Sequence, residues 1–218
     1  MNLNSNTKKI ICYGDSNTWG CIPDSVERYS VGVRWTGLLQ KMLGEDYEVI
    51  EEGLNGRTTV LDDPQVERIG KNGKTYLLPC LESQNPLDMV VVMLGTNDTK
   101  AKFNRTPQQI AEGLEELIRI IKDRAKDKAG KVPQIIIVSP PQVNENAEGT
   151  GEKYKGGEDK LRILAEEYKK VAEREGCFFV NIASYVTPSQ KDGLHLEPES
   201  HRKIAEVLAS KIQSLNLQ

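Results

Sequence analysis

The sequence predicts an α/β fold, with a parallel sheet that helices cover on both faces, and three observations predict it. Apolar runs with strand character alternate along the chain with segments of helical spacing, which is typical of parallel sheets. The run 87–94, LDMVVVML, is apolar throughout, as expected of a central strand buried on both faces. The chain has 218 residues, 38% of them hydrophobic, so we expect one large domain over residues 1–218 rather than two.

Five strands are expected, each a short apolar run that turn residues end. In chain order they are residues 10–13, 47–51, 87–94, 132–138 and 177–182. The first is cut off by Gly14-Asp15-Ser16-Asn17, and the fourth ends at Ser139-Pro140-Pro141. Between 58 and 86 the sequence has few periodic signals, and a stretch this long favours a functional loop or short helices.

Four helices are expected, each with apolar residues on one face. They span residues 33–43, a segment that Thr106 and Pro107 begin, residues 158–175 and residues 198–215. The first stops at Gly44, a residue suited to a helix C-terminus. Thr106 is a good N-cap, and Pro107 fits the first helical position. A polar, glycine-rich loop is expected over 142–157.

Charge and hydropathy exclude several functions. The formal net charge of -3 leaves no basic footprint, so we expect no nucleic-acid partner. No apolar run approaches the length of a membrane span, so no membrane association is expected. The first residues, MNLNSNTKK, lack the apolar region of a signal peptide. Together these features predict a cytoplasmic protein.

The cysteines give no sign of a metal or a disulfide. The four residues Cys12, Cys21, Cys80 and Cys177 are scattered, without metal-binding histidine spacing, and we expect no cofactor. Cys21 lies close to Ser16 in sequence and either lines a site or packs inertly. Gly73-Lys74-Thr75 is similar to the end of a phosphate-binding loop, but the upstream glycine is too close and no strand precedes it.

Residues 8–20, KKIICYGDSNTWG, place the Ser16 hydroxyl at the carboxyl end of the first predicted strand. Folds of this class hold reactive groups outside the carboxyl ends of their strands. Ser16 is therefore a candidate nucleophile. The alternative is that Asp15 and Ser16 only satisfy backbone groups in a turn. A nucleophilic role requires a base, an acid that orients the base, and a site for an oxyanion.

The chain has two histidines, so the choice of base is binary. His201 falls early in the last predicted helix, where we expect a surface or half-buried position. His195 precedes that helix, three residues after Asp192. A serine hydroxyl needs an adjacent base, and the imidazole needs a carboxylate to fix its tautomer. Asp192 and His195 supply both on one loop, unless they are a chance pair in a solvated turn.

Two further strand ends offer donors for an oxyanion. The turn 53–56 presents backbone N–H groups that glycine leaves accessible, and Asn97 presents a side-chain amide after the third strand. The alternatives are simple turn geometry at Gly53 and Gly56, and helix capping by Asn97 and Asp98. Four loops at the same sheet edge each carry one required part, and this coincidence favours the catalytic interpretation.

These residues resemble a known family. Gly14-Asp15-Ser16, Gly56, the segment 95–98 (GTND) and the segment 192–195 (DGLH) look like the four sequence blocks of the SGNH (GDSL-type) hydrolases, in the same order and across the whole chain. The stretches DSNTWG, RWTG, EEGLNGRTT, LGTNDTK and GGE are similar to the bacterial arylesterase branch, which includes acyltransferases and perhydrolases.

The resemblance implies a three-layer, flavodoxin-like fold with a five-stranded parallel sheet in the order 2-1-3-4-5. It implies Ser16 as nucleophile, His195 as base and Asp192 as the orienting acid. The oxyanion hole would consist of the Ser16 N–H, the Gly56 N–H and the Asn97 side chain. The sequence departs from the family where the turn before Gly56 begins Glu51-Glu52-Gly53 instead of an Asn-rich turn.

The expected function is a serine esterase that hydrolyses small acetyl-like and aryl esters through an acyl-enzyme, with acyl transfer to alcohols or peroxide. Apolar walls are expected from Trp19, Ile22 and Met93. The loop 141–157 is expected to cover the pocket or to contact another subunit, since the branch suggests a homo-oligomer. Alternatives with the same triad are a carbohydrate O-deacetylase and a thioesterase or lysophospholipase. A binding module on a degenerate hydrolase fold is the non-enzymatic alternative.

Overall fold

The computed structural model describes residues 6–63, 65 and 69–215. Within these residues the strands form one parallel sheet in the order β2-β1-β3-β4-β5, which confirms the predicted topology. The strands are β1 (Lys8–Gly14), β2 (Tyr47–Gly53), β3 (Met89–Met93), β4 (Gln134–Ser139) and β5 (Phe178–Asn181). All five overlap the predicted runs.

The α-helices of the described residues are α1 (Ser16–Trp19), α2 (Trp35–Leu43), α3 (Gly73–Gln84), α4 (Pro107–Arg124), α5 (Gly157–Glu175) and α6 (Pro198–Ser214). Short 3₁₀ helices are η2 (Asn97–Thr99), η3 (Ala101–Phe103), η4 (Glu152–Tyr154) and η5 (Ile182–Ser184). In the described residues, no helix combines the length and the apolar character needed to cross a membrane.

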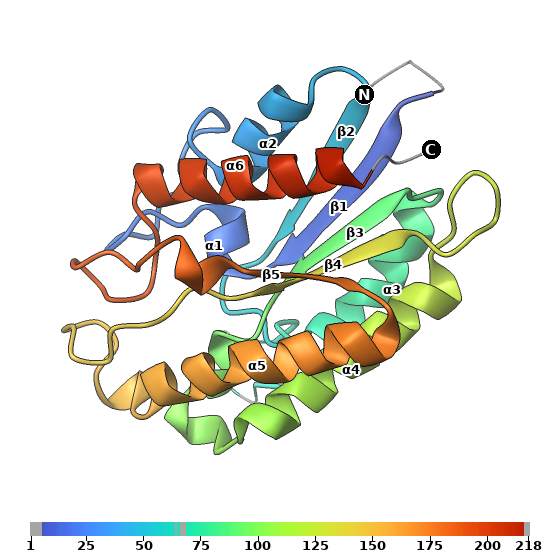
Figure 1. Cartoon of the computed structure of the whole chain (residues 1–218). Helices are drawn as coiled ribbons and strands as arrows, with labels where there is room; N and C mark the ends of the chain where they lie inside the picture. The colour runs from blue at the N-terminus through green and yellow to red at the C-terminus, as the bar shows by residue number, and fades with distance from the viewer. Residues whose placement is uncertain (1–5, 64, 66–68, 216–218) are drawn as a thin grey trace.

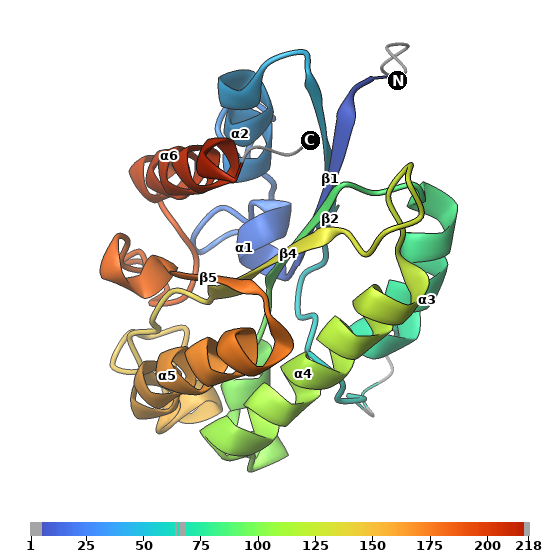
Figure 2. The same ribbon diagram turned by 45° about the vertical axis from the view of Figure 1, so that its right-hand side comes forward.

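The sheet is the middle of three layers (Figure 1). Helices α2 and α6 cover one face, and α3, α4 and α5 cover the other, as Figure 2 shows from a second direction. Alternate side chains of each strand enter opposite cores: Ile10 and Met89 pack toward α2 and α6, whereas Ile11 and Val90 pack toward α3, α4 and α5. Burial on both faces explains the unbroken apolar run of β3.

Helices α4 and α3 differ in how well their local sequence predicts them. At α4 the Thr106 hydroxyl accepts from Gln109 N, and the Gln109 side chain accepts from Thr106 N, so the predicted N-cap is part of a capping box. Helix α3 lies in the segment without periodic signals and contains Pro79 in its interior. Asn72 caps it by accepting from Lys74 N at 3.0 Å. Core packing therefore supports a helix whose sequence is locally unfavourable.

The prediction for His201 is wrong. Its side chain is 0% exposed, on α6 where that helix packs against α2. Trp35 N, at the start of α2, donates to His201 Nδ1 at 3.3 Å, and the N-cap residue Arg34 makes no side-chain cap. The imidazole thus satisfies an otherwise orphaned helix N–H. Burial, with the positive charges of Arg34 and His195, lowers the pKa of His201 to about 4.

Candidate active site

Ser16 begins α1 directly after β1 and is 7% exposed. Asp15 is the N-cap residue, and its Oδ1 accepts from Asn17 N at 3.0 Å, so Asp15 shapes this turn. A Cβ at Gly14 would lie 2.0 Å from the Thr18 Oγ1. Only glycine therefore lets the short helix fold back against the end of the strand, with the Ser16 hydroxyl at the sheet edge.

The Asp192 carboxylate binds four donors on its two oxygens. Oδ2 lies 2.7 Å from His195 Nδ1 and accepts from Asp24 N at 3.0 Å. Oδ1 accepts from Leu194 N at 2.9 Å and from His195 N at 3.0 Å. Burial acts to raise the pKa of Asp192, but the hydrogen bonds from His195, Asp24 and Leu194 outweigh it and lower this pKa well below its usual range. Asp192 is therefore ionised and fixed in orientation.

The same contacts act on the candidate base. Burial disfavours the charged imidazole of His195, but its hydrogen bond to Asp192 and its contact with the Cys21 side chain raise its pKa to about 9. Cys21 is buried, and its N–H donates to the Ser16 carbonyl at 3.0 Å. Of the two roles considered for Cys21, the structure favours a position in the wall of the site.

The Ser16 turn and the His195 loop are joined through their neighbours. Asn17 Nδ2 donates to the Leu194 carbonyl at 3.4 Å. Within the residues that the structure describes, no hydrogen bond links the Ser16 Oγ to the imidazole. Catalytic contacts of this kind commonly shorten only when substrate binds, so the arrangement is compatible with proton transfer between the two residues.

The candidate oxyanion donors Gly56 and Asn97 are linked to the turn that carries Ser16 through Arg57. Gly56 has φ of 79°, a conformation that favours glycine. The next residue, Arg57, is buried and donates from Nη1 to the Gly14 carbonyl at 2.9 Å. Asn97 Nδ2 donates to the Arg57 carbonyl at 3.1 Å. Arg57 thus connects the ends of β1 and β2 to the segment after β3, and brings Gly56 and Asn97 close to the nucleophile turn.

A second contact joins the same two segments. Asp98, fully buried, accepts from Thr59 N at 3.0 and 3.1 Å and from Thr59 Oγ1 at 2.6 Å. Burial raises the pKa of Asp98 to about 7; the hydrogen bonds from Thr59 oppose this shift and the nearby Asp15 adds to it. Burial also raises the pKa of Asp15, against the Asn17 N–H and the charges of His195 and Lys100. Two buried carboxyl groups therefore lie beneath the site.

The turn in which this sequence departs from the family's pattern has a defined role. Glu51 Oε1 accepts from Arg34 Nε at 3.0 Å and Oε2 from Arg34 Nη2 at 2.6 Å, with further contacts to Thr36 and Arg28. Arg28 also donates to the Trp19 carbonyl at 2.6 Å and lies over the Trp19 ring. Glu51 therefore anchors the loop between α1 and α2, which includes Cys21, whose N–H donates to the Ser16 carbonyl.

The three residues expected to line an acyl pocket are placed differently. Trp19 and Ile22 are partly exposed, at the end of α1 and just after it. Met93 is 2% exposed and belongs to the core between the sheet and helices α2 and α6. Because the Met93 side chain is packed into this core, we retain Trp19 and Ile22 alone as candidate walls.

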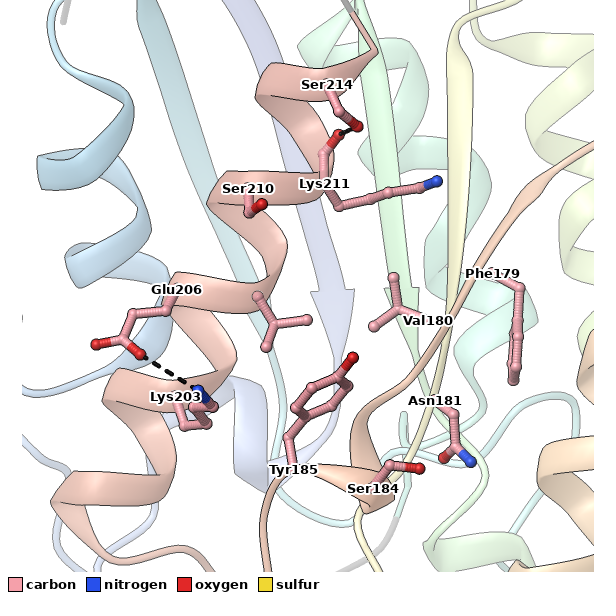
Figure 3. A pocket seen from close by; sticks show the side chains of 11 residues that line it. Phe179, Val180, Asn181, Ser184, Tyr185, Lys203, Glu206, Ser210, Lys211 and Ser214 are labelled. Atoms are coloured by element: carbon pink, nitrogen blue, oxygen red, sulfur yellow. Dashed lines mark hydrogen bonds and ion pairs between the residues drawn. The ribbon is translucent and has the colours of Figure 1, made fainter.

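A cavity of about 610 Å³ lies between β5 and α6, and no predicted site residue lines it (Figure 3). Lys203 and Glu206, both on α6, pair along that helix at the edge of the cavity at 3.7 Å. Gly73-Lys74-Thr75 forms the first turn of α3, where Lys74 contacts Glu116. In the described residues, no group of three or more His, Cys, Asp or Glu side chains is arranged to hold a metal ion.

Two residues of the site were not predicted from sequence. Arg57 follows Gly56 directly, so its place in the sequence beside a candidate oxyanion donor is the signal that could have indicated it, whereas its burial is seen only in the structure. Tyr154, in η4, donates from its hydroxyl to Asn97 Oδ1 at 3.3 Å. This contact joins residues 57 positions apart, and no local pattern indicates it.

Comparison with known proteins shows the family to which this chain belongs. The model of the GDSL-like lipase/acylhydrolase family matches residues 12–203. The chain belongs to this family and is a hydrolase of ester bonds, as the sequence predicts.

Three similar proteins match this chain over most of its length. The M. smegmatis aryl esterase is 40% identical with a TM-score of 0.89, over 96% of this chain and 100% of that one. A carbohydrate acetylesterase from Sinorhizobium meliloti is 36% identical with a TM-score of 0.89, over 96% and 100% of the two chains. An arylesterase from Vibrio mimicus is 26% identical over 214 residues, 94% of this chain and 88% of that protein.

Proposed function

We propose that the protein is a serine esterase that cleaves small acyl esters, aryl acetates among them, through an acyl-enzyme on Ser16. One observation carries the proposal: His195 Nδ1 lies 2.7 Å from Asp192 Oδ2, on a loop that Asn17, the neighbour of Ser16, contacts directly. A hydroxyl, an imidazole and an oriented carboxylate in this arrangement are the parts that nucleophilic ester cleavage needs.

In the proposed reaction the Ser16 Oγ attacks the ester carbonyl carbon, and His195 accepts the hydroxyl proton. The oxyanion accepts hydrogen bonds from Ser16 N, Gly56 N and Asn97 Nδ2. The bond to the leaving alcohol then breaks, and His195 returns the proton to the alkoxide. Water attacks the acyl-enzyme by the same route, with His195 as base, and releases the carboxylic acid and free Ser16.

The test is the substitution Ser16→Ala, with Ser83→Ala as the matched control because Ser83 lies on α3 and bonds only within that helix. Ser16→Ala is expected to abolish hydrolysis of p-nitrophenyl acetate and labelling by a fluorophosphonate. Ser83→Ala should retain both. Undiminished turnover or labelling in Ser16→Ala would exclude this mechanism.

Acetylated carbohydrate is the second candidate substrate class. The observation that favours it is the similarity to the S. meliloti carbohydrate acetylesterase, which matches as closely in TM-score as the aryl esterase does. Turnover of acetylated xylose, an aryl acetate and an aryl octanoate separates the candidates. The proposed specificity for small acyl groups predicts a preference for acetyl over octanoyl whichever alcohol leaves.

Two finer features belong to the same proposal. We propose that alcohols and peroxide replace water in the second step, as the similarity of DSNTWG and LGTNDTK to the acyltransferase-containing branch suggests. Acyl transfer is measured as ester formation when an alcohol is added to the aryl acetate reaction. We also propose a homo-oligomer, which light scattering of the purified protein tests.

A further inference from the structure

We propose that Tyr154 is a positioning residue that holds the Asn97 amide in the orientation needed to stabilise the oxyanion. The Tyr154 hydroxyl lies 3.3 Å from Asn97 Oδ1. The inference rests on the proposed function, in which Asn97 Nδ2 is an oxyanion donor. It assigns a role to the loop between β4 and α5, which carries Tyr154.

The two partners of Asn97 determine which way its amide points. The Arg57 carbonyl only accepts hydrogen bonds, so the group 3.1 Å from it must be Nδ2. The Tyr154 hydroxyl then faces Oδ1 and donates to it. One Nδ2 hydrogen is taken by Arg57, and the other stays available for a substrate oxygen. A rotated amide would put Oδ1 against the Arg57 carbonyl and remove the donor from the oxyanion.

The Tyr154 ring is fixed by the protein itself. The side chain is 1% exposed and lies in the core on the side of α3, α4 and α5. Its backbone N–H donates to the Thr150 carbonyl at 2.9 Å. Earlier in the same loop, Asn144 N donates to the Gly193 carbonyl at 2.8 Å, between Asp192 and His195 in sequence. One loop thus contacts both the triad loop and the oxyanion residue.

The effect should appear in the transition state. When Nδ2 donates to the developing oxyanion, negative charge increases on Asn97 Oδ1. A hydrogen bond from the Tyr154 hydroxyl to Oδ1 stabilises that charge. The 3.3 Å separation is long for an O–H···O bond, which usually measures about 2.7–2.8 Å, so the effect should be moderate. We expect kcat to fall about 3- to 10-fold without the hydroxyl, because a neutral hydrogen bond contributes about that factor.

The experiment is a double-mutant cycle on p-nitrophenyl acetate with the full chain. Tyr154→Phe keeps the buried ring and removes only the hydroxyl. It is expected to lower kcat with little change in KM, whereas Tyr185→Phe, at a tyrosine that is 53% exposed, should change neither. In an Asn97→Ala background, Tyr154→Phe should have no further effect on kcat, because the amide on which it acts is gone.

An unchanged kcat in Tyr154→Phe would overturn the inference. An equal loss with and without Asn97 would also overturn it, since Tyr154 would then act by another route. If the thermal unfolding midpoint of Tyr154→Phe equals that of the Tyr185→Phe control, the fold is intact. A lower midpoint for Tyr154→Phe, together with equal losses of kcat in both backgrounds, indicates a structural role instead. Wild-type protein without esterase activity, or an active Ser16→Ala, would reject the proposed function and this inference with it.

Discussion

Asp192 and His195 lie three residues apart on one loop, and Asp192 Oδ2 is 2.7 Å from His195 Nδ1. Three backbone N–H groups also bind this carboxylate, from Asp24, Leu194 and His195. The candidate triad acid is therefore held by its own loop and by the loop that follows α1. A change at Asp192 should disturb the tautomer of the base more than the fold around it.

Asp192→Asn should lower kcat about 1000-fold or more, because an amide in place of the carboxylate favours the wrong imidazole tautomer. The measurement is steady-state hydrolysis of an aryl acetate. Asp159→Asn is the matched control, since that carboxylate sits in the first turn of α5 with a side chain 80% exposed. A loss of less than about 10-fold in Asp192→Asn would contradict the assigned role.

The pH dependence of kcat/KM should follow His195. The imidazole accepts a proton only when it is neutral, and its pKa is raised to about 9. Activity should therefore increase as the pH rises and level off above about 9, which a series from about pH 6 to about pH 10 measures. A profile that is already flat at pH 7 would show that the base is neutral there and contradict the raised pKa.

Cys21→Ala should shift the rise of kcat/KM with pH to lower pH. Burial lowers the pKa of His195, whereas the hydrogen bond to Asp192 and the Cys21 side chain raise it, so removal of the Cys21 side chain should lower this pKa. Cys177→Ala serves as the control, because Cys177 lies near the start of β5 and contacts the Glu175 carbonyl. Equal profiles for the two variants would mean that Cys21 does not act on the base.

The features that were predictable from sequence depend on neighbours in the chain. Thr106, Pro107 and Gln109 define the start of α4 within four residues, and Asp192 and His195 are close enough in sequence to be paired. The site blocks were predictable for a related reason, since each follows a strand of a parallel sheet and all must meet at one edge.

The features that were missed depend on packing between distant segments. Helix α3 contains Pro79 and has no strong apolar periodicity, so its formation depends on packing against α4 and the core and on the Asn72 cap. His201 has a helical surface pattern around it, yet its imidazole accepts from Trp35 N across 166 positions. Tyr154 contacts Asn97 in the same way, through the core. No property of a single segment indicates these contacts.

Asp98 should make the protein less stable as the pH rises. Its pKa is raised from 3.8 to about 7, so the folded state holds this proton more tightly than the unfolded state. The free energy of unfolding should therefore fall between about pH 4 and about pH 7, by up to about 4 kcal/mol from this group. Urea unfolding of Asp98→Asn, whose amide oxygen still accepts from Thr59, should lack this slope. Parallel curves for the variant and the wild type would contradict the prediction.

His201 should have the opposite effect over an overlapping range. Its pKa is lowered from 6.5 to about 4, so the folded state binds this proton less readily than the unfolded state. The stability that neutral His201 contributes is present above about pH 6.5 and is lost as the pH falls toward about 4, to the extent of about 3 kcal/mol. Because Asp98 acts in the other direction, the wild-type curve conceals both contributions, and each must be measured against its own variant.

The informative variant is His201→Asn, because an amide oxygen can replace Nδ1 as the acceptor for Trp35 N without a titrating group. As the pH falls from about 6.5 to about 4, the unfolding free energy of the wild type should decrease relative to that of His201→Asn. His201→Ala lacks the acceptor as well as the charge. It should lose about 2 kcal/mol or more at pH 7 through the lost cap and the cavity left between α2 and α6. If His201→Asn and wild type instead lose stability in parallel below pH 6.5, the buried imidazole is not the group that titrates.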